Sequence, residues 1–155
     1  ELTEAAGLLP YEISNHARSI DARARHNLLY WRSQDWLGVG PGAHGRITHE
    51  DVRIASEAQR RPADYIDAVR EHGLGWVSDA VLSGEERADE TLIMGLRTDE
   101  GVDLVQIAAL RGRPLNQAAL AWLEAQGLVA CAAGRVRLSP RGRLLANKIA
   151  AELAV

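Results

Sequence analysis

The sequence is short of cysteine, methionine and phenylalanine: its 155 residues include one cysteine, one methionine and no phenylalanine. The single thiol, Cys131, excludes an internal disulfide and any zinc or iron–sulfur centre that needs several thiolates from this chain alone. No apolar run approaches the roughly 20 residues that span a bilayer, and the acidic start does not resemble a secretory signal. One unpaired thiol suits a reducing compartment, so we expect a cytoplasmic protein.

A large excess of either charge is also absent. The chain has 21 acidic and 18 basic residues, 46% hydrophobic residues and 25% charged residues. This balance is typical of a folded globular protein and gives no reason to expect bulk attraction to nucleic acid. The length predicts one domain or two small ones. Because the sequence starts without methionine and inside a helical pattern, we expect a piece of a longer chain.

The first part of the sequence predicts α/β elements that are too few for a sheet of their own. The expected elements are the end of a helix at residues 2–8, a strand at 11–15, a loop at 18–27, a buried strand at 36–40 and a glycine-rich turn at 41–45. We interpret this half as the last part of a larger barrel or sheet.

The second part is more regular. Pro62 begins a helix, Ser83 and Glu86 form a capping box, and Leu115, Ala119, Trp122 and Leu123 share one helical stripe. The expected elements are helices at residues 62–72, 83–97, 103–110 and 114–126, a hairpin at 127–138 and a last helix at 139–153. From residue 83 onward this order is that of a winged helix.

A winged helix raises the possibility of DNA binding, which needs donors for bases and phosphates. The predicted third helix offers Asn116 and Gln117 but no basic residue. A modest basic edge follows it, made of Arg135, Arg137, Arg141 and Arg143. We keep a nucleic-acid binder as the third hypothesis and expect no nucleic-acid partner.

Two short motifs could bind a ligand. The turn Gly38-Val39-Gly40-Pro41-Gly42-Ala43-His44-Gly45 allows close backbone approach, but Pro41 removes a donor and the spacing is not that of a dinucleotide fingerprint. The run His26-Asn27-Leu28-Leu29-Tyr30-Trp31 places an imidazole beside two aromatics, which would suit haem. From the residues alone, a tight turn and a packed surface histidine remain the alternatives.

Three stretches together resemble the HemN/HemW family of radical S-adenosylmethionine proteins in order and spacing. They are Tyr11-Glu12-Ile13-Ser14-Asn15-His16-Ala17, Arg25-His26-Asn27-Leu28-Leu29-Tyr30-Trp31 and Leu37-Gly38-Val39-Gly40-Pro41-Gly42-Ala43-His44-Gly45. The resemblance implies an α+β chain. Residues 1–47 would be the C-terminal end of a partial (β/α) barrel, 48–82 a connecting helical segment, and 83–155 a winged-helix-like C-terminal domain.

The resemblance also implies cofactors. Full-length members hold a [4Fe–4S] cluster with S-adenosylmethionine on an upstream Cys-x-x-x-Cys-x-x-Cys loop, and this chain has no such loop. In the family the glycine turn lies beside the S-adenosylmethionine pocket, which assigns Gly40, Gly42, Ala43 and His44 to cofactor contact.

The His-Asn-x-x-Tyr-Trp pattern is similar to the HemW branch, whose members bind haem and deliver it to haem proteins. By this resemblance His26 is the iron ligand, with Asn27, Tyr30 and Trp31 near the porphyrin, although His16 adds a second imidazole where many relatives have tyrosine. The implied partners are haem or porphyrin and haem-accepting apoproteins, with peripheral membrane association as a further expectation. The enzymatic alternative is oxygen-independent coproporphyrinogen III oxidation, and we expect this chain alone to be inactive.

Overall fold

The computed structural model describes residues 2–155, which divide into two compact units. One unit contains residues up to Ser33 together with Gly84–Val155, and the other contains Gln34–Ser83. The second unit is therefore inserted between two segments that pack on each other.

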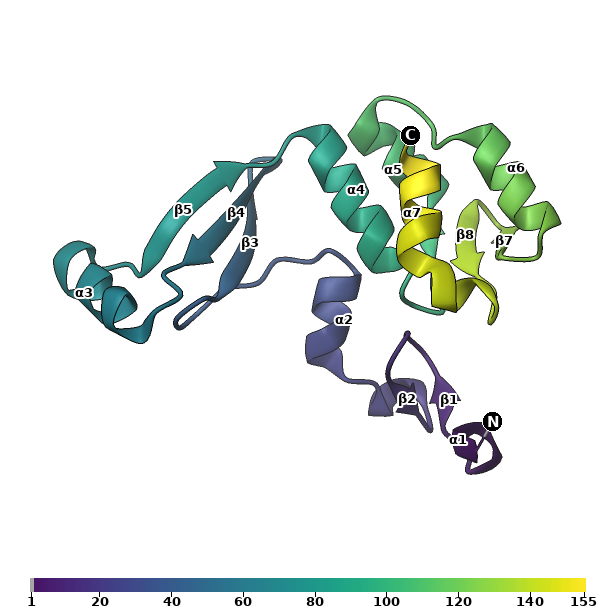
Figure 1. Cartoon of the computed structure of the whole chain (residues 1–155), viewed down its shortest axis with the longest axis horizontal. Coiled ribbons are helices and arrows are strands. Elements are labelled where there is room, and N and C mark those ends of the chain that lie inside the picture. Colours follow the sequence, from purple (N-terminus) through teal and green to yellow (C-terminus); the bar gives the residue numbers. More distant parts are fainter. Residues whose placement is uncertain (1) are drawn as a thin grey trace. The chain divides into compact units, whose positions relative to one another are not determined.

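The first unit combines short N-terminal elements with a helical C-terminal part (Figure 1). Its N-terminal elements are α1 (Leu2–Ala5), β1 (Leu9–Pro10), β2 (His16–Ala17), the 3₁₀ turn η1 (Ile20–Ala22) and α2 (Arg25–Trp31). Its C-terminal elements are α4 (Gly84–Gly95), β6 (Val102–Asp103), α5 (Leu104–Arg111), α6 (Gln117–Ala125), β7 (Val129–Ala132), β8 (Arg135–Leu138), η2 (Gly142–Leu145) and α7 (Ala146–Ala154). The helices and hairpin expected after residue 83 are all present.

Side-chain caps set where two of these helices begin. The Asp103 carboxylate accepts hydrogen bonds from the backbone N–H groups of Val105 and Gln106 at the start of α5. The Asn116 side chain accepts from the N–H of Ala119, so α6 starts at Gln117 rather than at Pro114, where the sequence predicts it. Each cap satisfies donors that have no partner inside the helix.

One apolar core holds the C-terminal part together. It is formed by the inward faces of α4, α5, α6 and α7 and by the three-stranded antiparallel sheet ordered β6-β8-β7. Leu92, Ile107, Val136 and Leu153 are each no more than 1% exposed. Trp122 differs from the expected stripe of α6, since 59% of its surface is exposed.

Residues 11–15 do not form the predicted strand. They make the turn between β1 and β2, closed by the Tyr11 N–H donating to the Asn15 carbonyl. Glu12 forms only an isolated bridge with Thr98. The prediction of a loop at residues 18–27 is also wrong at its end, because α2 already begins at Arg25.

The second unit is a three-stranded antiparallel sheet, which the sequence analysis did not anticipate. Figure 1 shows β3 (His44–His49), β4 (Val52–Ala58) and β5 (Trp76–Val81) side by side. The helix α3 (Pro62–His72) connects β4 to β5 with the bounds that the sequence predicts. The segment 48–82 therefore contains most of a sheet as well as the expected helix.

The predicted buried strand at residues 36–40 is wrong. Trp36 alone forms a bridge, to Arg46, while Leu37 and Val39 are 71% and 82% exposed. Gly38 lies so close to the His44 backbone that a Cβ there would be 2.5 Å from its carbonyl. The segment runs in an extended form beside the start of β3, and it is not a strand inside a core.

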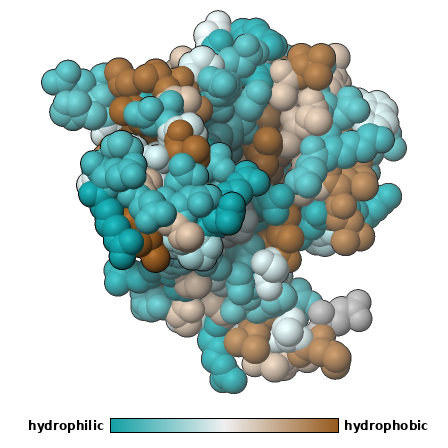
Figure 2. Space-filling view, turned by 60° about the vertical axis from the view of Figure 1, so that its left-hand side comes forward, coloured by the Kyte–Doolittle hydropathy of each residue, from teal (hydrophilic) through white to brown (hydrophobic). Residues whose placement is uncertain are grey.

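The chain is thus a mixed α+β structure, as predicted. On the face shown in Figure 2, apolar residues form separate patches on a largely hydrophilic surface. No helix among residues 2–155 is long and apolar enough to cross a membrane. The assignments of residues 1–47 to a barrel and of 83–155 to a winged-helix-like domain stay predictions.

Removing a core side chain from α7 will destabilise the first unit. Leu153 is fully buried, so Leu153→Ala should lower its free energy of unfolding by about 2–5 kcal/mol. Leu144→Ala provides the matched control, since Leu144 is 91% exposed and should change stability by less than about 0.5 kcal/mol. Denaturant unfolding followed by circular dichroism measures both, and equal losses would contradict the core described here.

Candidate functional site

The helix α2 presents His26 and Tyr30 on one exposed face. They are four residues apart, which places them one above the other on a helix. A 2.9 Å hydrogen bond joins the Tyr30 hydroxyl to His26 Nε2. The two rings meet edge to face, with centroids 4.8 Å apart and planes at 83°. The structure therefore holds the imidazole of His26 in one orientation at the surface.

Trp31 lies on a different side of α2 and anchors the helix. Its indole packs against a small core formed by Tyr11, Ala17 and Leu28. The Arg97 guanidinium stands over the ring, 5.5 Å from its centroid. The indole N–H is buried and has no hydrogen-bond partner among the described residues. Asn27, at the position one turn before Trp31, is half-buried.

A turn that follows α4 fixes α2 through two carboxylates. Asp99 accepts two hydrogen bonds from the Arg23 guanidinium, at 3.1 and 2.6 Å. Glu100 accepts two from Arg32, at 3.0 and 2.5 Å. Hydrogen bonds from Arg32 hold the pKa of Glu100 below its ordinary value, with further lowering by Arg23 and Arg135 against the opposing effect of burial. Glu100 in turn raises the pKa of Arg32.

The same turn also binds the edge of the β7–β8 hairpin. The Glu100 carbonyl accepts hydrogen bonds from the Nε atoms of Arg135 and Arg137, at 2.9 and 3.2 Å, and the Gly101 carbonyl accepts another from Arg135. Two of the four arginines in the predicted basic edge are therefore engaged within the protein. Sequence reasoning missed this network because its partners lie far apart in the chain.

Glu12 is a buried carboxylate in the turn between β1 and β2, which contacts the same turn after α4. Its side chain is fully buried and accepts hydrogen bonds from the Ser14 hydroxyl, at 3.0 Å, and from the Asn15 amide. Its backbone bridges Thr98, and the Tyr11 carbonyl accepts from the Asp99 N–H at 2.9 Å. Both residues thus position the N-terminal turn on residues 97–101. Glu12, Ser14 and Asn15 therefore form a hydrogen-bonded structural unit.

The glycine turn of the second unit uses its backbone donors internally. Gly40 and Gly42 have φ of 103° and 70°, which favours glycine there. The Gly40 N–H donates to the Tyr65 hydroxyl at 3.3 Å, the Gly42 N–H to the Gln59 carbonyl, and the Ala43 N–H to the Gly40 carbonyl. The His44 carbonyl accepts from the Trp36 indole, while its side chain is exposed.

A second ionic network in this unit was also missed by sequence reasoning. Arg53 is 6% exposed and donates to Asp35 at 3.0 Å, while Asp35 also accepts from the N–H and hydroxyl of Thr48. Burial opposes ionisation of Asp35, but the hydrogen bonds from Thr48 and the Arg53 charge prevail and lower its pKa. This network ties residues 34–36 to the β3–β4 hairpin.

The residues predicted to bind cofactors thus form two separate sets. His26, Asn27, Tyr30 and Trp31 belong to α2 of the first unit, and Gly40, Gly42, Ala43 and His44 to the second. Among the described residues, no group of three or more His, Cys, Asp or Glu side chains could hold a metal ion. Burial and the nearby Glu124 raise the pKa of Cys131, which makes its thiol a poor ligand. An iron–sulfur cluster does not fit the donors of this chain.

Comparison with known proteins identifies the class to which this structure belongs. The model of the HemN C-terminal domain matches residues 82–145. The chain is 32% identical to the haem chaperone HemW of Bacillus subtilis over 149 residues, which cover 94% of this chain and 38% of that protein. It is 40% identical over 103 residues to the zebrafish mitochondrial protein called radical S-adenosyl methionine domain-containing protein 1, covering 64% of this chain and 23% of that one.

A solved structure shares the fold. The Escherichia coli coproporphyrinogen III oxidase HemN, described as a radical SAM enzyme, aligns with 99% of this chain and 33% of its own, at a TM-score of 0.58 and 18% identity. The chain therefore belongs to the HemN/HemW family of radical S-adenosylmethionine proteins and matches the C-terminal part of its members. It spans less than two-fifths of the length of these relatives.

The contact between Arg32 and Glu100 should make stability depend on pH. The lowered pKa of Glu100 means that its contribution is complete above about pH 5 and is lost as the pH falls through the folded-state value. Glu100→Gln should therefore cost about 1 kcal/mol or less at pH 7, and this cost should fall toward zero as the pH drops below the folded-state pKa of Glu100.

Asp21→Asn is the control, because Asp21 is exposed and has no ion pair among the described residues. Urea unfolding at several pH values measures the difference. A Glu100→Gln deficit that persists unchanged at acidic pH would contradict the ionic role of Glu100.

Proposed function

We propose that this chain is part of a haem-binding protein that delivers haem to other proteins, with His26 as the iron ligand. The observation that carries the proposal is the exposed imidazole of His26, oriented by Tyr30 on a helix that is anchored from its other side. A neutral imidazole nitrogen is a common axial ligand of haem iron. The 32% identity to a protein named haem chaperone supports this choice.

The residues around His26 have different roles in this proposal. Tyr30 orients the imidazole through its hydroxyl and offers an aromatic edge beside it, while Trp31 and Arg32 hold α2 in place. Bound haem would supply the iron centre. Because Nε2 already shares a hydrogen bond, the Tyr30 hydroxyl must release it before that nitrogen can coordinate iron. A releasable bond of this kind suits transfer better than permanent storage.

S-adenosylmethionine and the iron–sulfur cluster are proposed only for full-length family members. The positive-φ glycines Gly40 and Gly42 support contact of this turn with S-adenosylmethionine, because they carry no side chain that would block a ligand, although the N–H groups of the turn are already engaged. We likewise propose a cytoplasmic location and partner proteins that accept haem. Coproporphyrinogen III oxidation is less well supported, because the HemN likeness is a likeness of fold.

Haem binding tests the role of His26 directly. Titration of the 155-residue chain with haemin should give an imidazole-type absorption spectrum in the wild type. His26→Ala should lose that spectrum and weaken binding about tenfold or more, while apolar contacts remain. Tyr30→Phe keeps the ring and frees Nε2, so it should retain the spectrum and tighten binding about threefold.

His16→Ala and His44→Ala are the matched controls, since each removes an exposed imidazole elsewhere in the chain. Both should leave the spectrum unchanged. The assignment of His26 is overturned if His26→Ala binds haemin as the wild type does while one of the controls does not. Conversion of coproporphyrinogen III by a full-length protein carrying this sequence would favour the enzymatic alternative instead.

A further inference from the structure

The helix α2 carries four neighbouring side chains on one face: Arg25, His26, Leu29 and Tyr30. Successive residues of an α-helix are rotated by about 100°, so these four lie within an arc of about 140°. Arg25 and His26 are exposed, Leu29 is 36% exposed and Tyr30 is half-buried. This face therefore offers a cation, an imidazole and an apolar surface side by side.

The arginines in and beside this helix differ in whether they have a partner. Arg23 and Arg32 each donate two hydrogen bonds to a carboxylate of the turn that follows α4. The side chain of Arg25, in contrast, makes no hydrogen bond or ion pair with any described residue. Since a guanidinium has five N–H donors and no acceptor, Arg25 keeps all of its donors for an anionic ligand.

Haem has three kinds of group that match this face in type and order. Propionate carboxylates extend from one edge of the ring, the iron lies at its centre, and the opposite edge is apolar. Along α2 the cation of Arg25 comes first, the imidazole of His26 follows, and the side chains of Leu29 and Tyr30 lie one turn later. A guanidinium binds a carboxylate through two parallel hydrogen bonds, for which its rigid fork is well suited.

We propose that Arg25 binds a propionate of haem and so fixes the direction in which the ring lies on α2. This inference rests on the proposed binding of haem at His26, and it adds that the carboxylate edge is recognised as well as the iron. Arg25 then determines specificity, because it favours a porphyrin with free carboxylates over one whose carboxylates are blocked. The contact is exposed to solvent, so its contribution to affinity should be modest, about three- to tenfold.

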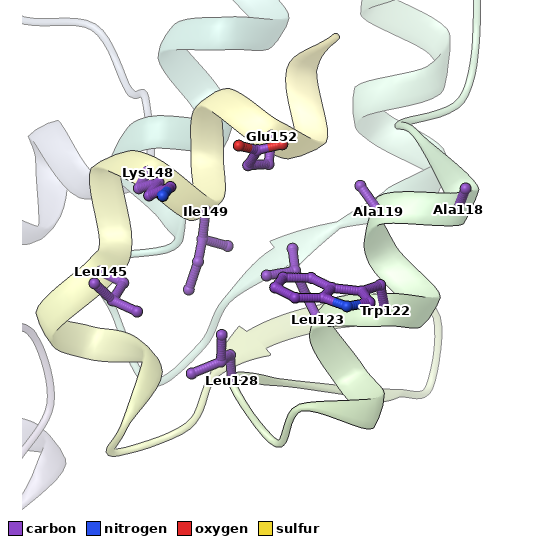
Figure 3. A pocket seen from close by; sticks show the side chains of 9 residues that line it. All are labelled: Ala118, Ala119, Trp122, Leu123, Leu128, Leu145, Lys148, Ile149 and Glu152. Atoms are coloured by element: carbon purple, nitrogen blue, oxygen red, sulfur yellow. The ribbon is translucent and has the colours of Figure 1, made fainter.

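An apolar groove in the first unit is a competing place for a flat apolar ring. It lies between α6 and α7 and has a volume of about 540 Å³. Figure 3 shows that Leu123, Leu128 and Ile149 line it together with the ring of Trp122, which is 59% exposed. Lys148 adds a cation, but no histidine is among the described residues that line the groove. Haem bound there would therefore lack an imidazole ligand, which separates the two places by their spectra.

A porphyrin with blocked carboxylates tests the role of Arg25. Haemin and haemin dimethyl ester have the same iron and ring, but the ester has no negative carboxylate. In absorption titrations the wild-type chain should bind haemin about three- to tenfold more tightly than the ester, with an imidazole-type spectrum for both. Arg25→Gln should keep that spectrum and bind both ligands with the affinity that the wild type has for the ester. Arg25→Lys should keep part of the preference, because the charge remains and the fork is lost.

Arg18→Gln and Trp122→Ala are the controls, and circular dichroism checks that every variant is folded. Arg18 is exposed and without a partner among the described residues, as Arg25 is, but it lies outside α2. Both controls should keep the preference for haemin. An equal loss of preference in Arg18→Gln and Arg25→Gln would indicate attraction by net charge alone and would overturn the proposal. A preference that only Trp122→Ala removes would place the recognition in the groove and overturn it equally.

The same titrations separate this inference from the proposed function. If the spectrum depends on His26 but the wild type binds the ester as tightly as haemin, the role of Arg25 is overturned and haem binding at His26 stands. If His26→Ala leaves the spectrum unchanged, both are overturned.

Discussion

The position of α2 depends on the turn at residues 97–101. The helix has seven residues and one buried residue, Leu28, which is too little to make a helix stable alone. Its stability comes from contacts outside itself: Arg32 on Glu100, the Arg97 guanidinium over Trp31, and the small core around Tyr11. The turn itself requires Gly101, whose φ is 66° and where a Cβ would lie 2.2 Å from the Val136 carbonyl.

In this arrangement one face of the short helix α2 anchors it to the unit, and another face is exposed. Trp31 and Arg32 face the body of the first unit, while His26 and Tyr30 remain outside. A side chain five residues after another on an α-helix is rotated by about 140° from it. The motif His-Asn-x-x-Tyr-Trp therefore encodes a face that can meet a ligand and a face that holds the helix. Both faces are needed if the imidazole is to keep a fixed position.

The parts of the structure that were predictable from the sequence are those with local signals. Pro62 and Gly73 mark the ends of α3, and the Val129–Leu138 hairpin follows from its turn residues. The sheet of the second unit was missed because β5 is exposed at five of its six positions and so lacks an alternating pattern. The prediction for residues 36–40 was wrong because the apolar side chains of Leu37 and Val39 are exposed instead of entering a core.

The candidate site was predictable only in part, because many of its contacts also have no local signal in the sequence. Family resemblance pointed to His26 and its neighbours, and the structure adds the contact between His26 and Tyr30 on successive turns of α2. The ion pairs from Arg23 to Asp99 and from Arg32 to Glu100 join residues 76 and 68 positions apart. Nothing in the local sequence marks such a pair. Likewise, spacing alone could not show that the turn at Gly40 consumes its own backbone donors.

The insertion of residues 34–83 between the two segments of the first unit bears on how the chain is made. During synthesis the N-terminal segment leaves the ribosome with its helix α2 but without the turn at residues 97–101 on which it docks. The inserted sheet has all of its strand partners within 34–83, so it can fold while the rest is still being translated. Residues 25–31, although translated before the inserted sheet, are thus among the last parts of residues 2–155 to reach their final shape.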